Sequence, residues 1–413
     1  MYLTREEEDM LHGKMGPAVQ KSMEILVALG EIYNAERMIP VNSVHMPGSS
    51  VVVAGDAGTE FVEEMAGTNV TFKARTTLNP AAIDFERWKE LRIPDEYAKR
   101  QKKLSLAYKS MGAILSHTCT PYLTGNLPRI GEHVSWGESS AICFVNSIQG
   151  ARTNREGGPS ALASAITGRT PLYGLHLDEN RKPRLLVKVS ARLSSITDYG
   201  ALGYYAGRVC KGENPYLTGI PTDASIDQLK MLGAALASSG SVALYHAKDV
   251  TPEARWAEEV TAKEGPKQTV ELGEAELKKA YEDLSKAQSD EIDVVCIGCP
   301  HNSIYEIRDV ARNLKSRKVN TNVRLWICTS CSVKSESDRM GYTKVIEQAG
   351  GIFMCDTCPV LSPVKEIAKR DGLKTIGTNS AKLAHYAPGQ CNLYPHYGML
   401  EKCISATISG RWN

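Results

Sequence analysis

The sequence has no apolar run of about 18 residues, so it contains no candidate for a membrane-spanning helix. It also lacks an excess of either charge, because 49 Lys and Arg stand against 47 Asp and Glu and give a net charge of +2. With no basic stripe, nothing in the sequence favours binding to nucleic acid or to an anionic membrane. The N-terminus is acidic, where a secretory signal is basic and then apolar. We therefore expect a cytoplasmic protein whose partner is a small molecule or another protein.

The composition is that of a folded globular protein. Apolar residues make up 42% of the 413 residues and charged residues 23%, which excludes a disordered or fibrous chain. This length predicts two or three domains. Eleven cysteines are present, and a reducing compartment disfavours disulfides. The thiols are therefore free to serve as core residues or metal ligands.

Four segments differ in character along the chain. Residues 1–250 form a first α/β region that begins with a helix capped by Thr4 and ended by Gly30. Within it, residues 118–169 are rich in Gly and short polar residues, which predicts loops. Residues 251–290 are charged and rich in alanine, as in a solvated helical connection. Residues 291–385 form a parallel α/β domain, and residues 386–413 a packed C-terminal tail.

Strands and helices alternate in the last domain. We expect strands at 292–297, 323–327 and 351–354, and helices at 303–314, 334–348 and 360–369. Near-continuous apolar strands separated by helices are typical of a parallel sheet covered on both faces. The fold class is therefore α/β.

Three C-x-x-C pairs lie at or just after these strands, and they comprise Cys296 with Cys299, Cys328 with Cys331, and Cys355 with Cys358. The carboxyl ends of parallel strands meet at one crevice, so thiols placed there converge. Cys299 and Cys358 are each followed by proline, which fixes the turn after the strand. Cys119 lies in a loop of the first region with Pro121 close behind. Cys296 lies within an apolar run and reads as a core residue.

Three thiolates suit a cubane iron-sulfur cluster in which one iron lacks a protein ligand. Such an iron is a Lewis acid, and this chemistry serves the removal of water from a hydroxy acid. The alternative is a zinc-stabilised, non-catalytic scaffold in which two C-x-x-C pairs hold one zinc, with the ligands Cys328, Cys331, Cys355 and Cys358. The spacing alone leaves Cys331 and Cys355 open as ligands.

Polar loops supply candidate substrate-binding residues. Gly48 allows a close approach to an anion, and Ser49 and Ser50 offer hydroxyls and amides to phosphate oxygens. In the loop from Gly150 to Gly158, Arg152 clamps a carboxylate or phosphate and Asn154 orients a hydroxyl. Ordinary turns and solvated arginines are the alternatives. The sequence assigns no role to four further residues, which are His117, His301, Glu138 and Glu156.

Several motifs together resemble the aconitase X family over essentially the whole chain. They are His117-Thr118-Cys119-Thr120-Pro121-Tyr122, Gly137-Glu138-Ser139-Ser140-Ala141, Gly150-Ala151-Arg152-Thr153-Asn154-Arg155-Glu156, Gly298-Cys299-Pro300-His301 and Thr357-Cys358-Pro359. The resemblance implies an aconitase-like multidomain fold and an iron-sulfur-dependent hydro-lyase. It also implies that Cys119, Cys299 and Cys358 hold a [4Fe-4S] cluster. Substrate-binding segments of the family match Gly48, Ser49 and Ser50, and Asn79 with Pro80.

The chain resembles the large subunit of the two-subunit members. This implies dehydration of (R)-5-phosphomevalonate to trans-anhydromevalonate 5-phosphate, a step of the archaeal mevalonate route to isoprenoids. The alternative is dehydration of cis-3-hydroxy-L-proline. In aconitases the base is a serine on a swivelling domain. We therefore expect a small subunit to supply the base and a lid, and we assign no catalytic base to this chain.

Overall fold

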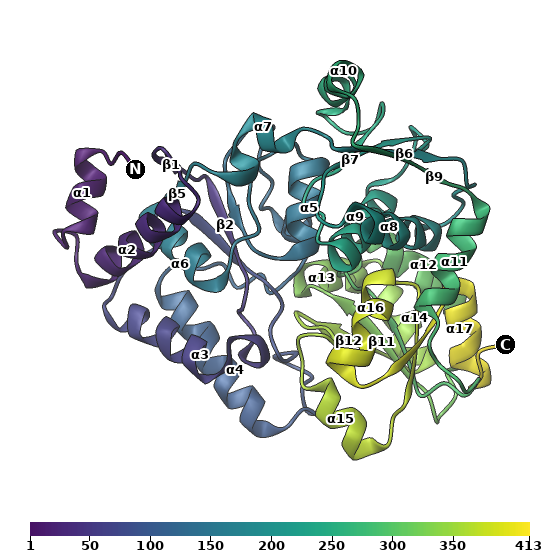
Figure 1. The fold of residues 1–413 in the computed structure, drawn as a ribbon. Helices are drawn as coiled ribbons and strands as arrows, with labels where there is room; N and C mark the ends of the chain where they lie inside the picture. The colour runs from purple at the N-terminus through teal and green to yellow at the C-terminus, as the bar shows by residue number, and fades with distance from the viewer.

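The computed structural model describes all 413 residues and arranges them around four sheets (Figure 1). A two-stranded antiparallel ribbon pairs β1 (Met38–Pro40) with β5 (Arg169–Pro171). The other three sheets are parallel. The three-stranded sheet has the order β3 (Arg75–Leu78), β2 (Ser43–Met46), β4 (Ser135–Trp136), and the four-stranded sheet has the order β8 (His246–Ala247), β7 (Pro215–Thr218), β6 (Leu185–Val189), β9 (Gln268–Leu272). The five-stranded sheet has the order β12 (Gly351–Cys355), β11 (Arg324–Thr329), β10 (Val294–Ile297), β13 (Thr375–Thr378), β14 (Tyr394–Tyr397).

Helices surround these sheets. Those before the four-stranded sheet are α1 (Arg5–Leu11), α2 (Pro17–Ile32), α3 (Val51–Gly67), α4 (Asp95–Ser110), α5 (Ser139–Ser147), α6 (Gly158–Thr167) and α7 (Asp178–Arg181). Those after the first strand of that sheet are α8 (Ile196–Cys210), α9 (Ile226–Gly240), α10 (Ala254–Glu264) and α11 (Glu274–Leu284). The last group is α12 (Ile304–Leu314), α13 (Cys331–Arg339), α14 (Tyr342–Ala349), α15 (Val364–Asp371), α16 (Ala381–Tyr386) and α17 (Leu400–Ser409). None of these helices has the length and apolar composition needed to span a bilayer.

The five-stranded sheet is buried on both faces. Side chains alternate along its strands, so Val295 and Ile297 enter a core with α12, α14 and α17, whereas Val294 and Cys296 enter the core of the N-terminal region. Cys296 is thus a core residue, as predicted. The prediction of an α/β fold with parallel sheets covered by helices is confirmed.

The order of this sheet defines where its ligand crevice lies. The chain adds β11 and β12 on one side of β10, then returns to add β13 and β14 on the other side. This reversal is a topological switch point, and open parallel sheets bind ligands outside the carboxyl ends of their strands at such a point. The loops that follow β10, β12 and β13 are therefore the ones that build the site.

Three local predictions were wrong. The first helix is two helices, because Gly13 and Gly16 have positive φ angles of 77° and 97° that end α1 before Pro17 starts α2. The helix predicted at 334–348 is broken by Gly341, whose φ is 76°. The segment 118–169, predicted as loops, contains α5 and α6. The N-cap of α5 is Glu138, which accepts a hydrogen bond from the Ala141 amide, and glutamate is a weak sequence signal for a helix start.

The remaining local predictions hold in part. Thr4 caps α1 with a full capping box with Glu7. The charged segment contains α11, as expected, but also β9, which pairs with β6 of the four-stranded sheet. The C-terminal tail contributes β14 to the five-stranded sheet and α17 to its cover. The domain boundaries given above stay a prediction.

Phe353 on β12 provides a test of this packing, because its side chain is fully buried in the core beneath α12 and α14. We expect Phe353→Ala to lower the free energy of unfolding by about 3–5 kcal/mol, through lost burial and the cavity left behind. Urea denaturation followed by circular dichroism measures this change. Tyr394→Ala on β14 is the control, since Tyr394 is 55% exposed, and should change stability by less than about 0.5 kcal/mol. Equal effects of the two substitutions would contradict the described core.

Candidate active site

A cavity of about 190 Å³ lies at the carboxyl ends of these strands. Cys119, Cys299 and Cys358 all line it, although they come from three separate loops. Cys299 follows β10, Cys358 follows β12, and Cys119 precedes a short 3₁₀ turn at Pro121–Thr124. Its other lining residues are Pro47, Gly48, Val53, Asn79, Pro80, Gly137, Glu138, Ser139, Val360, Leu361, Lys382 and Tyr386. The structure thus brings together the three thiols selected from the sequence.

Backbone contacts hold the thiols in place. The His301 amide donates to Cys119 Sγ at 3.2 Å, which ties the first-region loop to the loop after β10. The Ser380 hydroxyl donates to the Cys299 carbonyl. The residue before Cys299 must be glycine. Gly298 has a φ of 111°, and a Cβ at this position would lie 2.3 Å from the Cys328 carbonyl oxygen. The turn that presents Cys299 is therefore fixed by contacts from both sides.

Burial dominates the protonation of these thiols. It raises the pKa of Cys119 to about 12, that of Cys358 to about 11, and that of Cys299 well above its ordinary value. The negative charges of neighbouring thiolates and, at Cys119, of Glu138 act in the same direction, while the positive charge of Lys382 opposes them. A metal must displace these protons, so ligand binding here is coupled to proton release.

The four thiols of the zinc alternative do not form one site. Cys328 Sγ lies 3.5 Å from Cys296 Sγ inside the sheet, Cys331 neighbours Cys355, and Cys358 lines the cavity. No group of three or more His, Cys, Asp or Glu side chains in the chain is arranged to hold a single metal ion. A cluster of several iron atoms holds its thiolates farther apart than one ion does, so the donor set of the cavity suits a cluster.

The predicted substrate loops form the opposite wall. Gly48, with φ of 69°, lines the cavity together with Asn79 and Pro80. The Ser49 hydroxyl donates to the Asn79 carbonyl at 2.5 Å and the Ser50 hydroxyl donates to the Leu361 carbonyl at 2.7 Å, so neither hydroxyl has a hydrogen left to donate to a phosphate, and neither residue lines the cavity. The buried Asn79 side chain lies beside the ring of His45 on β2, and hydrogen bonding between them favours the protonated form of that histidine.

Gln101 explains why these two loops stay together. Its fully buried side chain accepts from the amides of Val51 and Ala82 at 3.1 and 3.0 Å and donates to the Ser49 carbonyl at 2.8 Å. One amide group thus joins the start of α3 to the segment after Pro80. The shape of the wall depends on α4, which carries Gln101.

The structure does not bring Arg152 and Asn154 to this cavity. Arg152 donates to the His176 carbonyl at 3.1 Å and pairs with Asp178. Asn154 donates to the Tyr173 carbonyl at 3.1 Å and accepts from the Leu175 amide at 2.8 Å, and it lines a different cavity. Both side chains brace the segment before α7.

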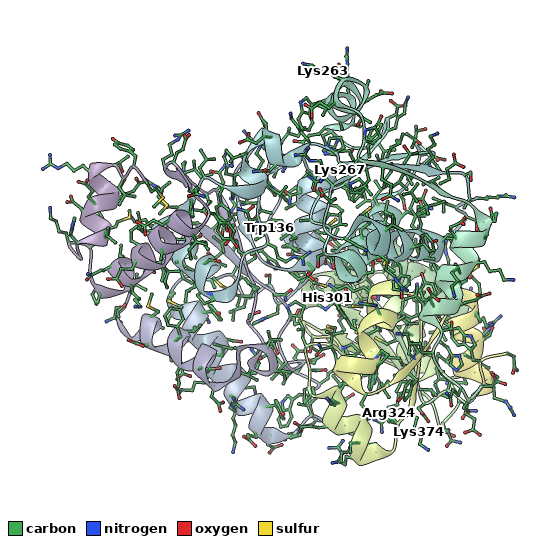
Figure 2. All side chains as sticks on the ribbon, viewed as in Figure 1. Trp136, Lys263, Lys267, His301, Arg324 and Lys374 are labelled. Carbon is green, nitrogen blue, oxygen red and sulfur yellow. The ribbon has the colours of Figure 1, made fainter.

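The two histidines beside the ligands support loops and do not line the cavity. His301 hydrogen-bonds the Thr118 hydroxyl and the Thr357 carbonyl, each at 3.0 Å, and Figure 2 shows it in the middle of the molecule where the N- and C-terminal parts meet. His117 contacts Ser105 Oγ at 3.3 Å. Burial lowers the pKa of both histidines to about 4, so they are neutral at pH 7.

The two glutamates without a predicted role, Glu138 and Glu156, lie at different places. Glu138 lines the cavity, whereas Glu156 accepts a hydrogen bond from the Ser160 hydroxyl at 2.7 Å at the start of α6. Burial raises the pKa of Glu156. Burial also opposes ionisation of Glu138, but Lys382 and the Ala141 amide outweigh it and lower the pKa of this carboxyl. Glu138 is thus a carboxylate already engaged by a cation.

Lys382 and Tyr386 are cavity residues that the sequence reasoning missed. Lys382 is 8% exposed, and its Nζ donates to Glu138 Oε1 at 2.5 Å and to Ser140 Oγ at 2.6 Å. Both residues lie on α16, directly after β13. The sequence signal for β13 is weak, because Ile376 is the only large apolar side chain in Thr375–Thr378, although the rule that located the cysteines also applies to the end of this strand.

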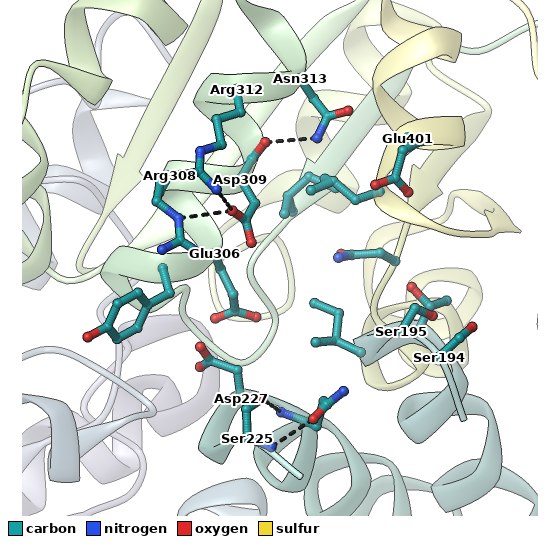
Figure 3. Close-up of a pocket in the computed structure, with 17 residues that line it drawn as sticks. Ser194, Ser195, Ser225, Asp227, Glu306, Arg308, Asp309, Arg312, Asn313 and Glu401 are labelled. Carbon is teal, nitrogen blue, oxygen red and sulfur yellow. Dashed lines mark hydrogen bonds and ion pairs between the residues drawn. The ribbon is translucent and has the colours of Figure 1, made fainter. Parts of the chain in front are cut away.

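A larger cavity of about 550 Å³ lies on the other side of the loop after β10, where Figure 3 shows Ser194, Asp227, Glu306, Arg308 and Glu401 around it. It is lined by charged side chains, several of which pair with one another, and by no cysteine. A third cavity, beside Tyr305 and Met340, is larger still at about 600 Å³, so size does not select the active site. The cavity of about 190 Å³ is the stronger active-site candidate, because it combines three thiols with a buried ion pair.

Comparisons with known proteins identify relatives over the whole chain. Family models of the aconitase X first, second and third domains match residues 1–179, 183–282 and 292–409. The phosphomevalonate dehydratase large subunit of Methanocaldococcus jannaschii is 47% identical, over 98% of this chain and 99% of its own length. The cis-3-hydroxy-L-proline dehydratase of Pseudomonas aeruginosa is 34% identical, over 98% of this chain and 70% of its own. The crystal structure of Thermococcus kodakaraensis aconitase X in its holo-form superposes with a TM-score of 0.89 at 40% identity, over 98% of this chain and 100% of that one.

His45 on β2 gives a pH-dependent test of the substrate wall. Its Nδ1 contacts Thr77 Oγ1 at 3.0 Å, and burial lowers its pKa from 6.5 to about 4. The unfolded chain therefore binds this proton at a higher pH than the folded chain does. The stability contributed by neutral His45 is fully present above pH 6.5 and is lost as the pH falls toward 4.

We expect the melting temperature of the wild-type protein to fall as the pH falls from 6.5 to 4. In His45→Gln the free energy of unfolding should depend less steeply on pH, by up to about 1.4 kcal/mol per pH unit. Differential scanning calorimetry at a series of pH values measures it. His385→Gln is the control, because His385 is only partly buried. If His45→Gln and wild type keep parallel profiles, His45 does not titrate as described.

Proposed function

The chain belongs to the aconitase X family, and we propose that it is the large subunit of a phosphomevalonate dehydratase. It converts (R)-5-phosphomevalonate to trans-anhydromevalonate 5-phosphate and water in the mevalonate route to isoprenoids. Four relatives with that name are 42–48% identical over 94–100% of the chain. The two relatives named cis-3-hydroxy-L-proline dehydratase are 31–34% identical and extend well beyond the matched region. This difference is the observation that carries the proposal.

The charges of the cavity support the same choice of substrate. The alternative substrate, cis-3-hydroxy-L-proline, brings an ammonium group that needs an acidic neighbour. Glu138 is the only carboxylate that lines the cavity, and Lys382 already neutralises it. Phosphomevalonate instead carries two anionic groups, a carboxylate and a phosphate, and needs no additional carboxylate.

Cys119, Cys299 and Cys358 would hold a [4Fe-4S] cluster, which is the cofactor we propose for this subunit. When bound, the cluster supplies an iron without a protein thiolate, a Lewis acid suited to a departing hydroxyl. The support is the donor set, which consists of three buried thiols facing one cavity. The positive charge of Lys382 favours the thiolate form of all three.

The chain's own residues would bind and orient the substrate between two walls. Gly48 leaves the cavity open to a close-lying anion because it has no side chain. Asn79 and Pro80 line the same wall as Gly48. Val53, Val360 and Leu361 add apolar side chains to the lining.

A partner subunit would complete the site. None of the lining residues is a histidine, and the one lining carboxylate, Glu138, is held by Lys382. Val52 and Val53 at the start of α3 are 41% and 56% exposed beside it. The relatives are named as large subunits, and we propose a small subunit that covers this face and supplies a serine as the base for the C2 proton.

Turnover by the co-purified two-subunit enzyme tests the substrate. We expect dehydration of (R)-5-phosphomevalonate, followed by NMR of the product, and no conversion of cis-3-hydroxy-L-proline under the same anaerobic conditions. The large subunit alone is the control and should be inactive with either substrate. Conversion of hydroxyproline alone would overturn the phosphomevalonate proposal.

Iron and sulfide content tests the ligand assignment. We expect Cys119→Ala, Cys299→Ala and Cys358→Ala each to lose most of the bound iron and sulfide, together with the visible absorbance of the cluster. Cys210→Ala is the matched control, because Cys210 is equally buried but lies on α8 away from the cavity. Zinc at one atom per chain, with no iron or sulfide in anaerobically prepared wild type, would instead support the scaffold alternative.

A further inference from the structure

Lys382 is the one cationic side chain that lines the cavity of the three thiols. We propose that it binds the carboxylate of the substrate and is held in position for this role by Glu138 and Ser140. The inference rests on the proposed function, because it requires a substrate with a carboxylate next to the carbon that loses its proton. It assigns to this chain a substrate-binding residue that no sequence motif indicated.

The geometry leaves one donor of the ammonium group free. A lysine ammonium has three N–H donors, and two of them are used by Glu138 Oε1 at 2.5 Å and Ser140 Oγ at 2.6 Å. Glu138 and Ser140 both belong to the start of α5, so both contacts hold Nζ from the same side. The third donor has no protein partner, and Lys382 lines the cavity.

The burial of this group argues for a ligand as well as for a structural pair. A buried ion pair is costly unless its remaining hydrogen-bonding capacity is satisfied, and an apolar pair at such a place is often as stable. An anion in the cavity satisfies the remaining donor of Lys382, and the carboxylate of a hydroxy acid is such an anion.

The position of the charge also suits the reaction. As the C2 proton leaves, negative charge spreads onto the oxygens of the adjacent carboxylate. A fixed ammonium at those oxygens stabilises this charge more than it stabilises the ground state. Lys382 therefore contributes to substrate affinity and to the rate of proton removal, while the base that takes the proton comes from elsewhere.

The test is a cycle of two changes, one in the protein and one in the ligand. Isothermal titration of the cluster-loaded two-subunit enzyme measures affinity for phosphomevalonate and for its carboxamide analogue. We expect wild type to bind the acid about ten- to hundredfold more tightly than the amide. In Lys382→Met the two affinities should agree within about twofold, and in Lys382→Arg the preference should be partly restored. Removing the cation should also lower kcat.

Two further variants guard against a purely structural effect. Lys382→Met leaves Glu138 buried without its partner, so the double variant Lys382→Met/Glu138→Gln removes both charges and keeps the experiment possible if the single variant fails to fold. Arg181→Met is the matched control, because Arg181 is equally buried and paired with Glu253 but lies outside the cavity. It should lower stability without changing the acid-over-amide preference. Iron and sulfide content is compared in every variant.

The outcomes separate the two proposals. If the Lys382 variants keep the wild-type preference for the acid at equal iron content, Lys382 does not bind the carboxylate. If wild type neither binds nor dehydrates phosphomevalonate, the proposed function fails. The same cycle with cis-3-hydroxy-L-proline and its amide then decides the role of Lys382 alone.

Discussion

The parallel alignment of the five-stranded sheet is the constraint on which the rest of the site depends. Because β10, β12 and β13 point the same way, the loops after them open at one edge and carry Cys299, Cys358 and Lys382 there. Cys119 reaches the same place through a loop tied down by the His301 amide. Alternation along the same strands directs the other thiols, such as Cys296, into the core.

The parts of the structure that follow from local pattern were predictable. The apolar runs at 292–297 and 351–354 are strands, and the rule that such strands end at a common crevice selected Cys299 and Cys358 together. Spacing alone left Cys331 and Cys355 open as metal ligands, and the family resemblance reduced the expected ligands to Cys119, Cys299 and Cys358. The breaks at Gly13 and Gly341 were missed because a periodic apolar pattern continues across them, while a positive φ is a property of the folded backbone.

The parts that depend on distant partners were not predictable in this way. Ser49 and Ser50 have the chemistry to bind phosphate, but carbonyls of Asn79 and Leu361 already take their hydroxyls. Arg152 has the chemistry to clamp an anion, but Asp178 lies within its reach. Lys382 was overlooked for the converse reason, since a lysine in a short helix resembles a solvated residue until Glu138 is placed beside it.

The walls of the cavity come from residues as far apart as Pro47 and Tyr386, and this has a consequence for biosynthesis. A ribosome must release the chain through Tyr386 before the last wall, α16, can dock. Ser380 and Lys382, which fasten that helix to Cys299 and Glu138, emerge after the residues of every other wall. A chain that stops before α16 therefore folds with a cavity that is open on one side.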